Sequence, residues 1–380
     1  MKNLIYLDYN DTTPIDPEVF ESMVPYLTEH FGNPSSNHRY GKITKEAIEH
    51  AREQLANLIN CSPSEIVFTS GGTESNNYAI MGIASKMKSQ GNHIITSQIE
   101  HPAVSEVCAH LEKKGFEITY LPVDEYGLVS IGDIEKSIRK STILITIMHA
   151  NNEIGTIQPI AEIGELAKKN KIHFHTDAAQ SVGKLEIDVK KMNVDLLSIA
   201  GHKFYAPKGI GALYVKKSII LTKMMHGANH ELNRRPGTEN VSGIIGLGKA
   251  AEIAKRDFKK NYDLLYTLRE TLFNKLKEKN LDMRLNGHQT KRLPNTLSVS
   301  FPNKESSLIL SKLEEIAASA GSACHANDIK ISGVLKAINL PIHYATGTIR
   351  FSIGKFLSLN EIEKASGLIN AVIQQLNGKS

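Results

Sequence analysis

The sequence predicts an α/β protein with a large domain, built on a mainly parallel seven-stranded sheet, and a smaller α+β domain. Three observations predict this. The chain of 380 residues is long enough for two domains. Between residues 65 and 215, short β-prone runs alternate with amphipathic stretches, as in parallel sheets flanked by helices. Residues 295–380 mix strand-like and helical patterns. The large domain is expected to span 15–255, and the smaller one 1–14 and 256–380.

The elements of the large domain follow from these runs. Strands are expected at 65–69, 93–97, 117–121, 142–148, 171–176, 194–199 and 211–215. Helices are expected at 74–87, 103–114, 131–140 and 160–170. Residues 62–65 (Ser-Pro-Ser-Glu) have the letters of a helix capping box. Because a β-prone run follows them, no helix is expected there.

The second part of the chain begins with a long helical pattern at 241–279, which could link the two domains. Strands are then expected at 295–301 and 348–353, with a helix at 305–314 between them. Ser358 and Glu361 match a capping box, so a final helix is expected to begin after Ser358.

Composition excludes several function classes. The net charge of +5 is small and forms no basic stripe with interleaved aromatics, so nucleic-acid binding is not expected. The apolar runs are too short to span a bilayer and the N-terminus lacks a signal-peptide core, so a cytoplasmic location without membrane attachment is expected. Cys61, Cys108 and Cys324 form neither a disulfide framework nor a paired metal-binding spacing, so no metal site is expected.

Lys203 is the first candidate for chemistry. It follows the β-prone run 194–199 through an alanine, a glycine and a histidine. A desolvated lysine amine loses its proton and becomes a nucleophile that can form a Schiff base. Most lysines are solvated surface charges, so the position of Lys203 alone is a weak signal. Two further motifs strengthen it.

Asp177 and a Gly-Gly turn are those motifs. Asp177 ends the run that begins at residue 172, and an aspartate at the end of a buried strand is unusual without a partner. Enzymes that use pyridoxal 5'-phosphate (PLP) pair such an acid with the pyridine nitrogen and hold the cofactor on a lysine. Gly71, Gly72 and Thr73 lead from a strand-like run into a helix-like segment, which suits a phosphate. Together the three motifs predict PLP as cofactor.

His101 and Asn152 each have two interpretations. His101 lies just beyond an expected strand end, where an imidazole could stack on a cofactor ring and move protons. Alone, it is better explained as a surface or core-edge histidine. Asn151 and Asn152 follow the strand expected at 142–148, where an amide could bind a cofactor hydroxyl; a simple turn role is equally compatible.

Cys324 and Arg350 are the remaining candidates. Cys324 lies among small residues and before His325 in a segment with the composition of a mobile loop, which suits attack on sulfur. The alternative is an incidental free thiol, which fits Cys61 and Cys108 better. Arg350 has apolar neighbours and could bind a substrate carboxylate through both arms, or form a structural salt bridge.

The chain resembles the cysteine desulfurases and selenocysteine lyases, which are PLP-dependent enzymes of fold type I within the class-V aminotransferases. The resemblance runs nearly end to end. It is carried by ordered motifs at residues 6–14, 31–36, 69–77, 100–101, 151–155, 175–180, 201–203, 235–240, 321–324 and 349–352.

The resemblance implies roles around the cofactor. Lys203 would hold PLP as an imine and move protons, Asp177 would pair with the pyridine nitrogen, and His101 would stack on the ring. Gln180 and Asn152 would lie near the phenolic oxygen and the substrate carboxylate. The phosphate would be held by three residues of the same chain and one of a neighbouring subunit in a homodimer: Gly72, Thr73 and His202, and Thr238.

The resemblance also implies how the substrate is handled. The substrate would be L-cysteine or L-selenocysteine, with Arg350 clamping its carboxylate and Asn10 and Asn152 also in contact with it. Cys324 would attack the substrate sulfur and carry it as a persulfide, leaving alanine. A sulfur-acceptor protein such as an iron–sulfur scaffold would then receive the sulfur.

Some positions depart from the usual pattern. Ala200 stands where many desulfurases have a serine that contacts the phosphate. His325 follows the cysteine where many housekeeping desulfurases have threonine, and this Cys-His pair is more similar to selenocysteine lyases. The chain ends soon after the last helix, without the long tail with which some desulfurases dock a scaffold.

The leading hypothesis is a cysteine desulfurase, and the alternative within the class is a selenocysteine lyase. An aminotransferase would not need Cys324 and would require a keto acid. A non-catalytic scaffold is disfavoured because Lys203, Asp177, His101 and Cys324 occur together.

Overall fold

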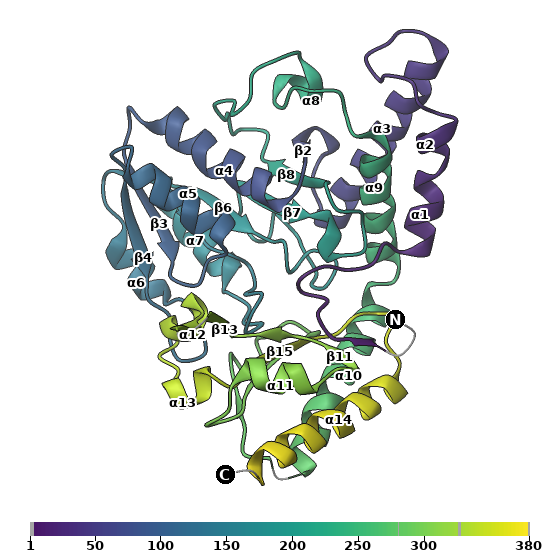
Figure 1. Ribbon diagram of the computed structural model, residues 1–380. Helices are drawn as coiled ribbons and strands as arrows, with labels where there is room; N and C mark the ends of the chain where they lie inside the picture. Colours follow the sequence, from purple (N-terminus) through teal and green to yellow (C-terminus); the bar gives the residue numbers. More distant parts are fainter. Residues whose placement is uncertain (1–3, 280, 326–327, 379–380) are drawn as a thin grey trace.

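The large part of the molecule is built on one seven-stranded sheet (Figure 1). The computed structural model describes residues 4–279, 281–325 and 328–378, without the side chains of 322–330. The strands are β2 (Ile66–Thr69), β3 (His93–Ser97), β4 (Glu117–Leu121), β5 (Thr142–Thr146), β6 (His173–Asp177), β7 (Leu196–Ala200) and β8 (Gly211–Val215). They lie in the order β2-β8-β7-β6-β5-β3-β4, and β8 alone runs antiparallel to the other six strands of this sheet. The predicted mainly parallel sheet is confirmed.

Helices cover both faces of this sheet (Figure 1). The helices of this part are α1 (Pro17–Met23), α2 (Pro25–Thr28), α3 (Arg39–Ile59), α4 (Gly72–Met87), α5 (Pro102–Glu112), α6 (Ile131–Ser137), α7 (Ile160–Lys169), α8 (His230–Asn233) and α9 (Val241–Arg256); α1 and α2 lie against α9, outside the sheet. Among the described residues, no helix is long and apolar enough to cross a membrane.

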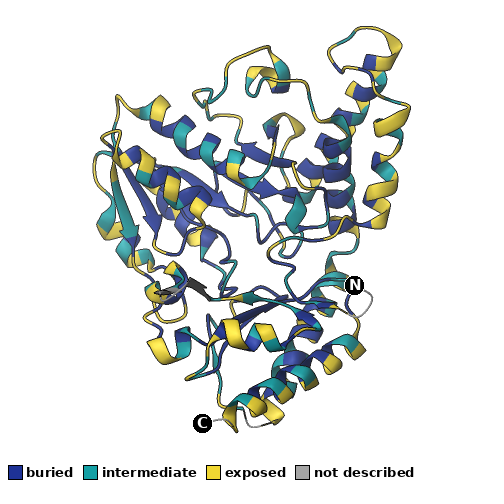
Figure 2. Cartoon of the chain, in the orientation of Figure 1, coloured by how far each residue is buried: buried dark blue, intermediate teal, exposed yellow. Residues whose placement is uncertain are grey.

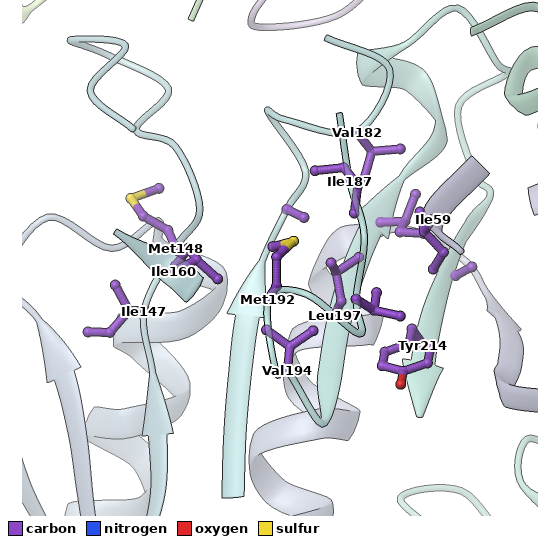
Figure 3. Close-up of a cluster of buried hydrophobic side chains, with 14 of the residues drawn as sticks. Ile59, Ile147, Met148, Ile160, Val182, Ile187, Met192, Val194, Leu197 and Tyr214 are labelled. Atoms are coloured by element: carbon purple, nitrogen blue, oxygen red, sulfur yellow. The ribbon is translucent and has the colours of Figure 1, made fainter. Parts of the chain in front are cut away.

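The sheet is buried on both faces because successive side chains of a strand point to opposite sides. Ile94 packs with apolar residues of α4 and α5, whereas Ile95 packs with those of α3, α7 and α9. The same alternation holds for Leu144 and Ile145 on β5, and for Leu196 and Leu197 on β7. Figure 2 shows that the strands of this sheet are buried. Figure 3 shows part of the apolar cluster that contains Ile95, including Ile59, Leu197 and Tyr214.

The smaller part has its own apolar core, formed by α10 (Phe258–Glu278), α14 (Leu359–Asn377) and an antiparallel sheet of order β12-β15-β10-β9. The strands are β9 (Arg284–Leu285), β10 (Thr296–Ser300), β12 (Ser319–Ala320) and β15 (Thr348–Ser352). β1 (Ile5–Tyr6) pairs with β11 (Ile316–Ala317), so the N-terminal residues join this core. The short helix α11 (Ser306–Lys312) adds Ile309 to this core, whereas the buried apolar residues of α12 (Gly333–Ala337) and α13 (Ile342–Ala345) join a core cluster of the large part. The exact domain boundaries remain our prediction.

Three sequence expectations need correction. The helical pattern at 241–279 is two helices, because the backbone of Asp257 leaves the helical conformation between α9 and α10. The capping box at 62–65 does form, around a single 3-10 turn (Pro63–Glu65) that ends where β2 begins. The segment around Cys324 has strand backbone: β13 (Ser322–His325) pairs antiparallel with β14 (Asp328–Ile331), where a loop was expected.

Candidate active site

The candidate active site lies where the parallel strands of the large sheet end. The carboxyl ends of β2, β3, β5, β6 and β7 share one edge, and ligands of open α/β sheets bind outside this edge. A pocket of about 560 Å³ opens there. Among the described side chains, its lining includes every predicted site residue except Thr238: Asn10, Gly72, Thr73, His101, Asn152, Asp177, Gln180, His202, Lys203 and Arg350.

The Gly-Gly turn forms a backbone cradle at one end of the pocket. Gly71 adopts φ +154°, ψ −177°, a conformation that favours glycine, and a Cβ added there would meet no atom within 4 Å. α4 begins at Gly72, and the first N–H groups of a helix have no partners within it. A Cβ on Gly72 would lie 3.2 Å from the Cβ of Ala200, so Gly72 and Ala200 are close neighbours in the pocket lining. This geometry suits a phosphate.

Lys203 reaches into the pocket from the turn after β7. Its Nζ donates hydrogen bonds to the carbonyl oxygens of Asn10, at 2.8 Å, and Asp11. Burial lowers the pKa of Lys203, and the nearby Arg350 acts in the same direction, whereas Asp11 opposes the shift. A lowered pKa makes the neutral, nucleophilic amine more accessible near neutral pH.

Asp177 is buried at the end of β6. Its Oδ2 accepts a 2.7 Å hydrogen bond from Nδ2 of Asn76, and its Oδ1 accepts one from the N–H of Ala179 at 2.9 Å. Oδ1 of Asn76 is buried and has no partner among the described residues. Asn76 therefore fixes the direction of the Asp177 carboxylate, a role that the sequence did not reveal.

Two histidines flank the lysine. His101 begins α5, and its Nδ1 accepts a hydrogen bond from the N–H of Ala103 at 3.1 Å, so the remaining ring proton lies on Nε2 when the ring is neutral. Burial lowers the pKa of His101, although the charge of Asp177 opposes this. His202 lies 3.1 Å from the Thr12 hydroxyl, and burial, with Lys203, lowers its pKa to about 4. We infer that both imidazoles are neutral at pH 7.

Asn10 is held by partners on several segments. Its Nδ2 donates to Thr296 Oγ1 at 2.8 Å and to the Asn152 carbonyl at 3.0 Å, and its Oδ1 accepts from Asn295 at 2.9 Å. Its backbone carbonyl accepts from Gln180 Nε2 at 2.8 Å. The side-chain amide of Asn10 is thus already engaged, so its backbone carbonyl is the group that faces Lys203.

Arg350 lies on β15 of the smaller sheet and crosses to the pocket. Its Nη2 donates to Asp8 Oδ1 at 2.7 Å and to Ser319 Oγ at 3.0 Å, and its Nη1 donates to the Asn152 carbonyl at 3.1 Å. Its buried Nε–H has no acceptor among the described residues. Arg350 thus forms a salt bridge with Asp8 and also lines the pocket, so the structure is compatible with both interpretations made from the sequence.

The three cysteines and Thr238 are the remaining residues that the sequence analysis considered. The Cys324 thiol lies outside the described side chains, although its backbone is in β13. Cys61 and Cys108 are free thiols, and burial raises the pKa of each to about 12, so both are poor nucleophiles. Thr238 is exposed and is not among the described residues that line the pocket.

Glu100 and Lys184 are further buried charged residues near the site that the sequence did not single out. Burial raises the pKa of Glu100 to about 8, against hydrogen bonds from the Ser97 hydroxyl at 2.6 Å and the Met148 N–H. Glu100 therefore connects the end of β3 with the residues that follow β5. Lys184 donates a 2.9 Å hydrogen bond to the Gln180 amide oxygen.

Together these residues fit PLP. The Gly71–Gly72 cradle suits the phosphate, Asp177 offers an oriented carboxylate for the ring nitrogen, and Lys203 offers an amine for its aldehyde. The arrangement defines a PLP-dependent enzyme of the α/β class.

Comparisons with known proteins agree with this class. The family model for class-V aminotransferases matches residues 5–365, so the chain belongs to this PLP-dependent family. It is 50% identical to the cysteine desulfurase IscS of Dictyoglomus turgidum over 99% of this chain and 96% of the relative. It is 49% identical to the same enzyme of Methanosarcina thermophila over 99% of this chain and 93% of the relative.

Solved structures give the same result. A NifS-like protein, 37% identical, superposes with a TM-score of 0.92 and covers 98% of this chain and all of its own. A structure of SspA in complex with cysteine, 41% identical, has a TM-score of 0.81 over 93% of this chain and 99% of its own.

Proposed function

We propose that this protein is a cysteine desulfurase that converts L-cysteine to L-alanine and passes the sulfur to Cys324 as a persulfide. The observation that carries the proposal is the combination of Lys203, Asp177 and Arg350 around one pocket, in a chain with full-length relatives named cysteine desulfurase. In the net step, the substrate C–S bond breaks, an S–S bond forms at Cys324, and the substrate carbon gains a proton. The step is balanced without an external oxidant or reductant.

In this reaction Lys203, Arg350 and Asp177 would each have a different role. Bound PLP supplies an electron sink for the substrate α-carbon. Lys203, with its lowered pKa, is suited to take and return protons near that carbon. Arg350 lines the pocket and is held by Asp8, so its guanidinium group is positioned to bind and orient the substrate carboxylate. Asp177, oriented by Asn76, would pair with the ring nitrogen of the bound cofactor.

The first test is a product assay on purified holoenzyme. With L-cysteine we expect equal molar amounts of L-alanine and enzyme-bound sulfur until every Cys324 thiol carries a persulfide. L-selenocysteine is assayed in parallel. An enzyme that is inert on cysteine but releases alanine from selenocysteine would instead be a selenocysteine lyase.

We further propose that the enzyme is a homodimer in which Thr238 completes the partner's phosphate site. Thr238 is exposed on the loop after α8, and Arg235 on this loop is paired with Glu74 at the start of α4, at 2.9 Å. A row of large apolar side chains is also exposed on and after α1 and α2. It comprises Phe20, Val24, Leu27, Phe31 and Tyr40. Phe31 is 73% exposed, which is unusual for phenylalanine in a monomer and suits a covering second copy.

Mixed dimers test whether Thr238 acts across the interface. Thr238→Ala alone should weaken PLP binding about tenfold, the value of one hydrogen bond to a charged phosphate. In a dimer of one Thr238→Ala subunit and one Lys203→Ala subunit, the site with an intact lysine receives Thr238 from its partner. Its PLP affinity should therefore return to the wild-type value. Pairing wild type with the Lys203→Ala/Thr238→Ala double variant should not restore it. Equal affinities in both mixtures would contradict action across the interface.

The thiol chemistry of Cys324 also suggests a sulfur acceptor and a cellular location. A persulfide on Cys324 has to be handed to another thiol, so we propose a sulfur-acceptor protein, such as an iron–sulfur scaffold, as partner. We also propose that the enzyme works in the cytoplasm, because a reducing compartment keeps a transfer cysteine in the thiol form.

A further inference from the structure

Lys184 is a buried lysine that the proposed reaction does not use. It follows β6 by seven residues, in the turn that carries Gln180, and its side chain is 6% exposed. Its Nζ donates to Gln180 Oε1 at 2.9 Å and lies 3.5 Å from Asn10 Oδ1. Among the described residues, no carboxylate oxygen lies within 4.0 Å of Nζ.

An unpaired buried cation is costly, so packing alone does not account for Lys184. Burial lowers its pKa to about 7, and the positive charges of Lys203 and Arg350 lower it further in the same direction. A methionine of similar length would fill the space without this desolvation cost. The reason for a lysine here is therefore to be sought in what its ammonium group holds.

The ammonium group holds one orientation of the Gln180 amide. With Oε1 facing Lys184, the Nε2 group donates to the Asn10 carbonyl at 2.8 Å, the same oxygen that accepts from Lys203 Nζ at 2.8 Å. If the amide were rotated by half a turn, two donors would face each other at Lys184 and two acceptors at Asn10. The ammonium form of Lys184, which has no acceptor, thus excludes the rotated amide.

The second hydrogen of Gln180 Nε2 has no partner among the described residues, and Gln180 lines the pocket. We propose that Lys184 is a positioning residue that fixes the Gln180 amide, so that its N–H donates to the phenolic oxygen of PLP held on Lys203. The inference rests on the placement of PLP in this pocket and does not depend on which amino acid is the substrate.

The test reads the bound cofactor in the absence of substrate. The pH midpoint of the change in its absorbance band is measured in holoenzyme and in Lys184→Met. A donor to the phenolic oxygen stabilises the deprotonated cofactor, so losing it should raise the midpoint by about 0.5–1 pH unit, the equivalent of one hydrogen bond. Lys191→Met, on an exposed lysine of the following segment, controls for the change in net charge and should leave the midpoint unchanged. A direct effect of the Lys184 charge on Lys203 would persist when Gln180 is replaced, which distinguishes it from an effect through the amide.

A double-mutant cycle separates positioning from packing. If Lys184 acts through Gln180, the shift caused by Lys184→Met should fall to less than half in a Gln180→Leu background. Lys184→Gln, which keeps a neutral donor, should shift the midpoint less than Lys184→Met. The cofactor-free Lys184→Met protein should melt at the same or a higher temperature, because it lacks the unpaired buried cation. Equal shifts in both backgrounds, equal shifts for Gln and Met, or a lower melting temperature with an unshifted midpoint would overturn the proposal.

Discussion

Lys203→Ala should abolish alanine formation, with a loss of about 10³-fold or more, because it removes both the covalent attachment of PLP and the group suited to proton transfer. PLP should still bind, although more weakly, through the Gly71–Gly72 cradle and Asp177. The measurements are alanine release and the absorbance of the purified protein, which should lose the yellow colour of lysine-bound cofactor.

Borohydride reduction identifies the attachment point directly. In wild type, mass spectrometry should find reduced PLP on the peptide that contains Lys203. Lys208, the other lysine lining the pocket, provides the matched control: Lys208→Ala should still be labelled on Lys203. Labelling of a different lysine in wild type would refute the assignment. Because burial lowers the pKa of Lys203, the rate at which free PLP attaches should already be high near neutral pH and should fall as the amine protonates at lower pH.

The sheet was predictable because each strand lies in a short β-prone run and these runs alternate with amphipathic stretches. β3, β4 and β8 have the expected limits, since His93–Ser97, Glu117–Leu121 and Gly211–Val215 are buried or paired along their length. The helices at the N-terminus had no corresponding expectation. α3 (Arg39–Ile59) is strongly amphipathic, so its period of 3.6 residues was a usable signal.

The site was predictable where a residue's position along a strand determines its role. Asp177, His101 and Lys203 all follow strand ends, and strand ends meet at one edge of a parallel sheet. Asn76 and Lys184 were missed because their roles depend on partners brought close by folding. Asn76 is 101 residues from Asp177, and Lys184 lies 174 residues from Asn10. No local pattern reports such contacts.

Cys324→Ala should abolish alanine formation from cysteine, by about 10³-fold or more, while leaving substantial cleavage of selenocysteine. Sulfur is released poorly unless a thiolate takes it, so desulfuration requires a nucleophile. Selenium leaves more readily, so its release depends less on that thiolate. The two substrates therefore separate the role of Cys324 from the roles of Lys203, Asp177 and Arg350, which both substrates require.

The other two cysteines provide controls for the Cys324→Ala variant. Cys61→Ala and Cys108→Ala should leave turnover of both substrates near the wild-type level, because burial raises the pKa of each thiol to about 12 and keeps it protonated. After a single turnover with cysteine, mass spectrometry should find one added sulfur on the Cys324 peptide and none on the peptides of Cys61 or Cys108. Unchanged cysteine turnover in Cys324→Ala would reject the persulfide mechanism. Loss of both activities would show instead that Cys324 is needed for the shape of the site, because a group that acts only on sulfur leaves selenium release intact.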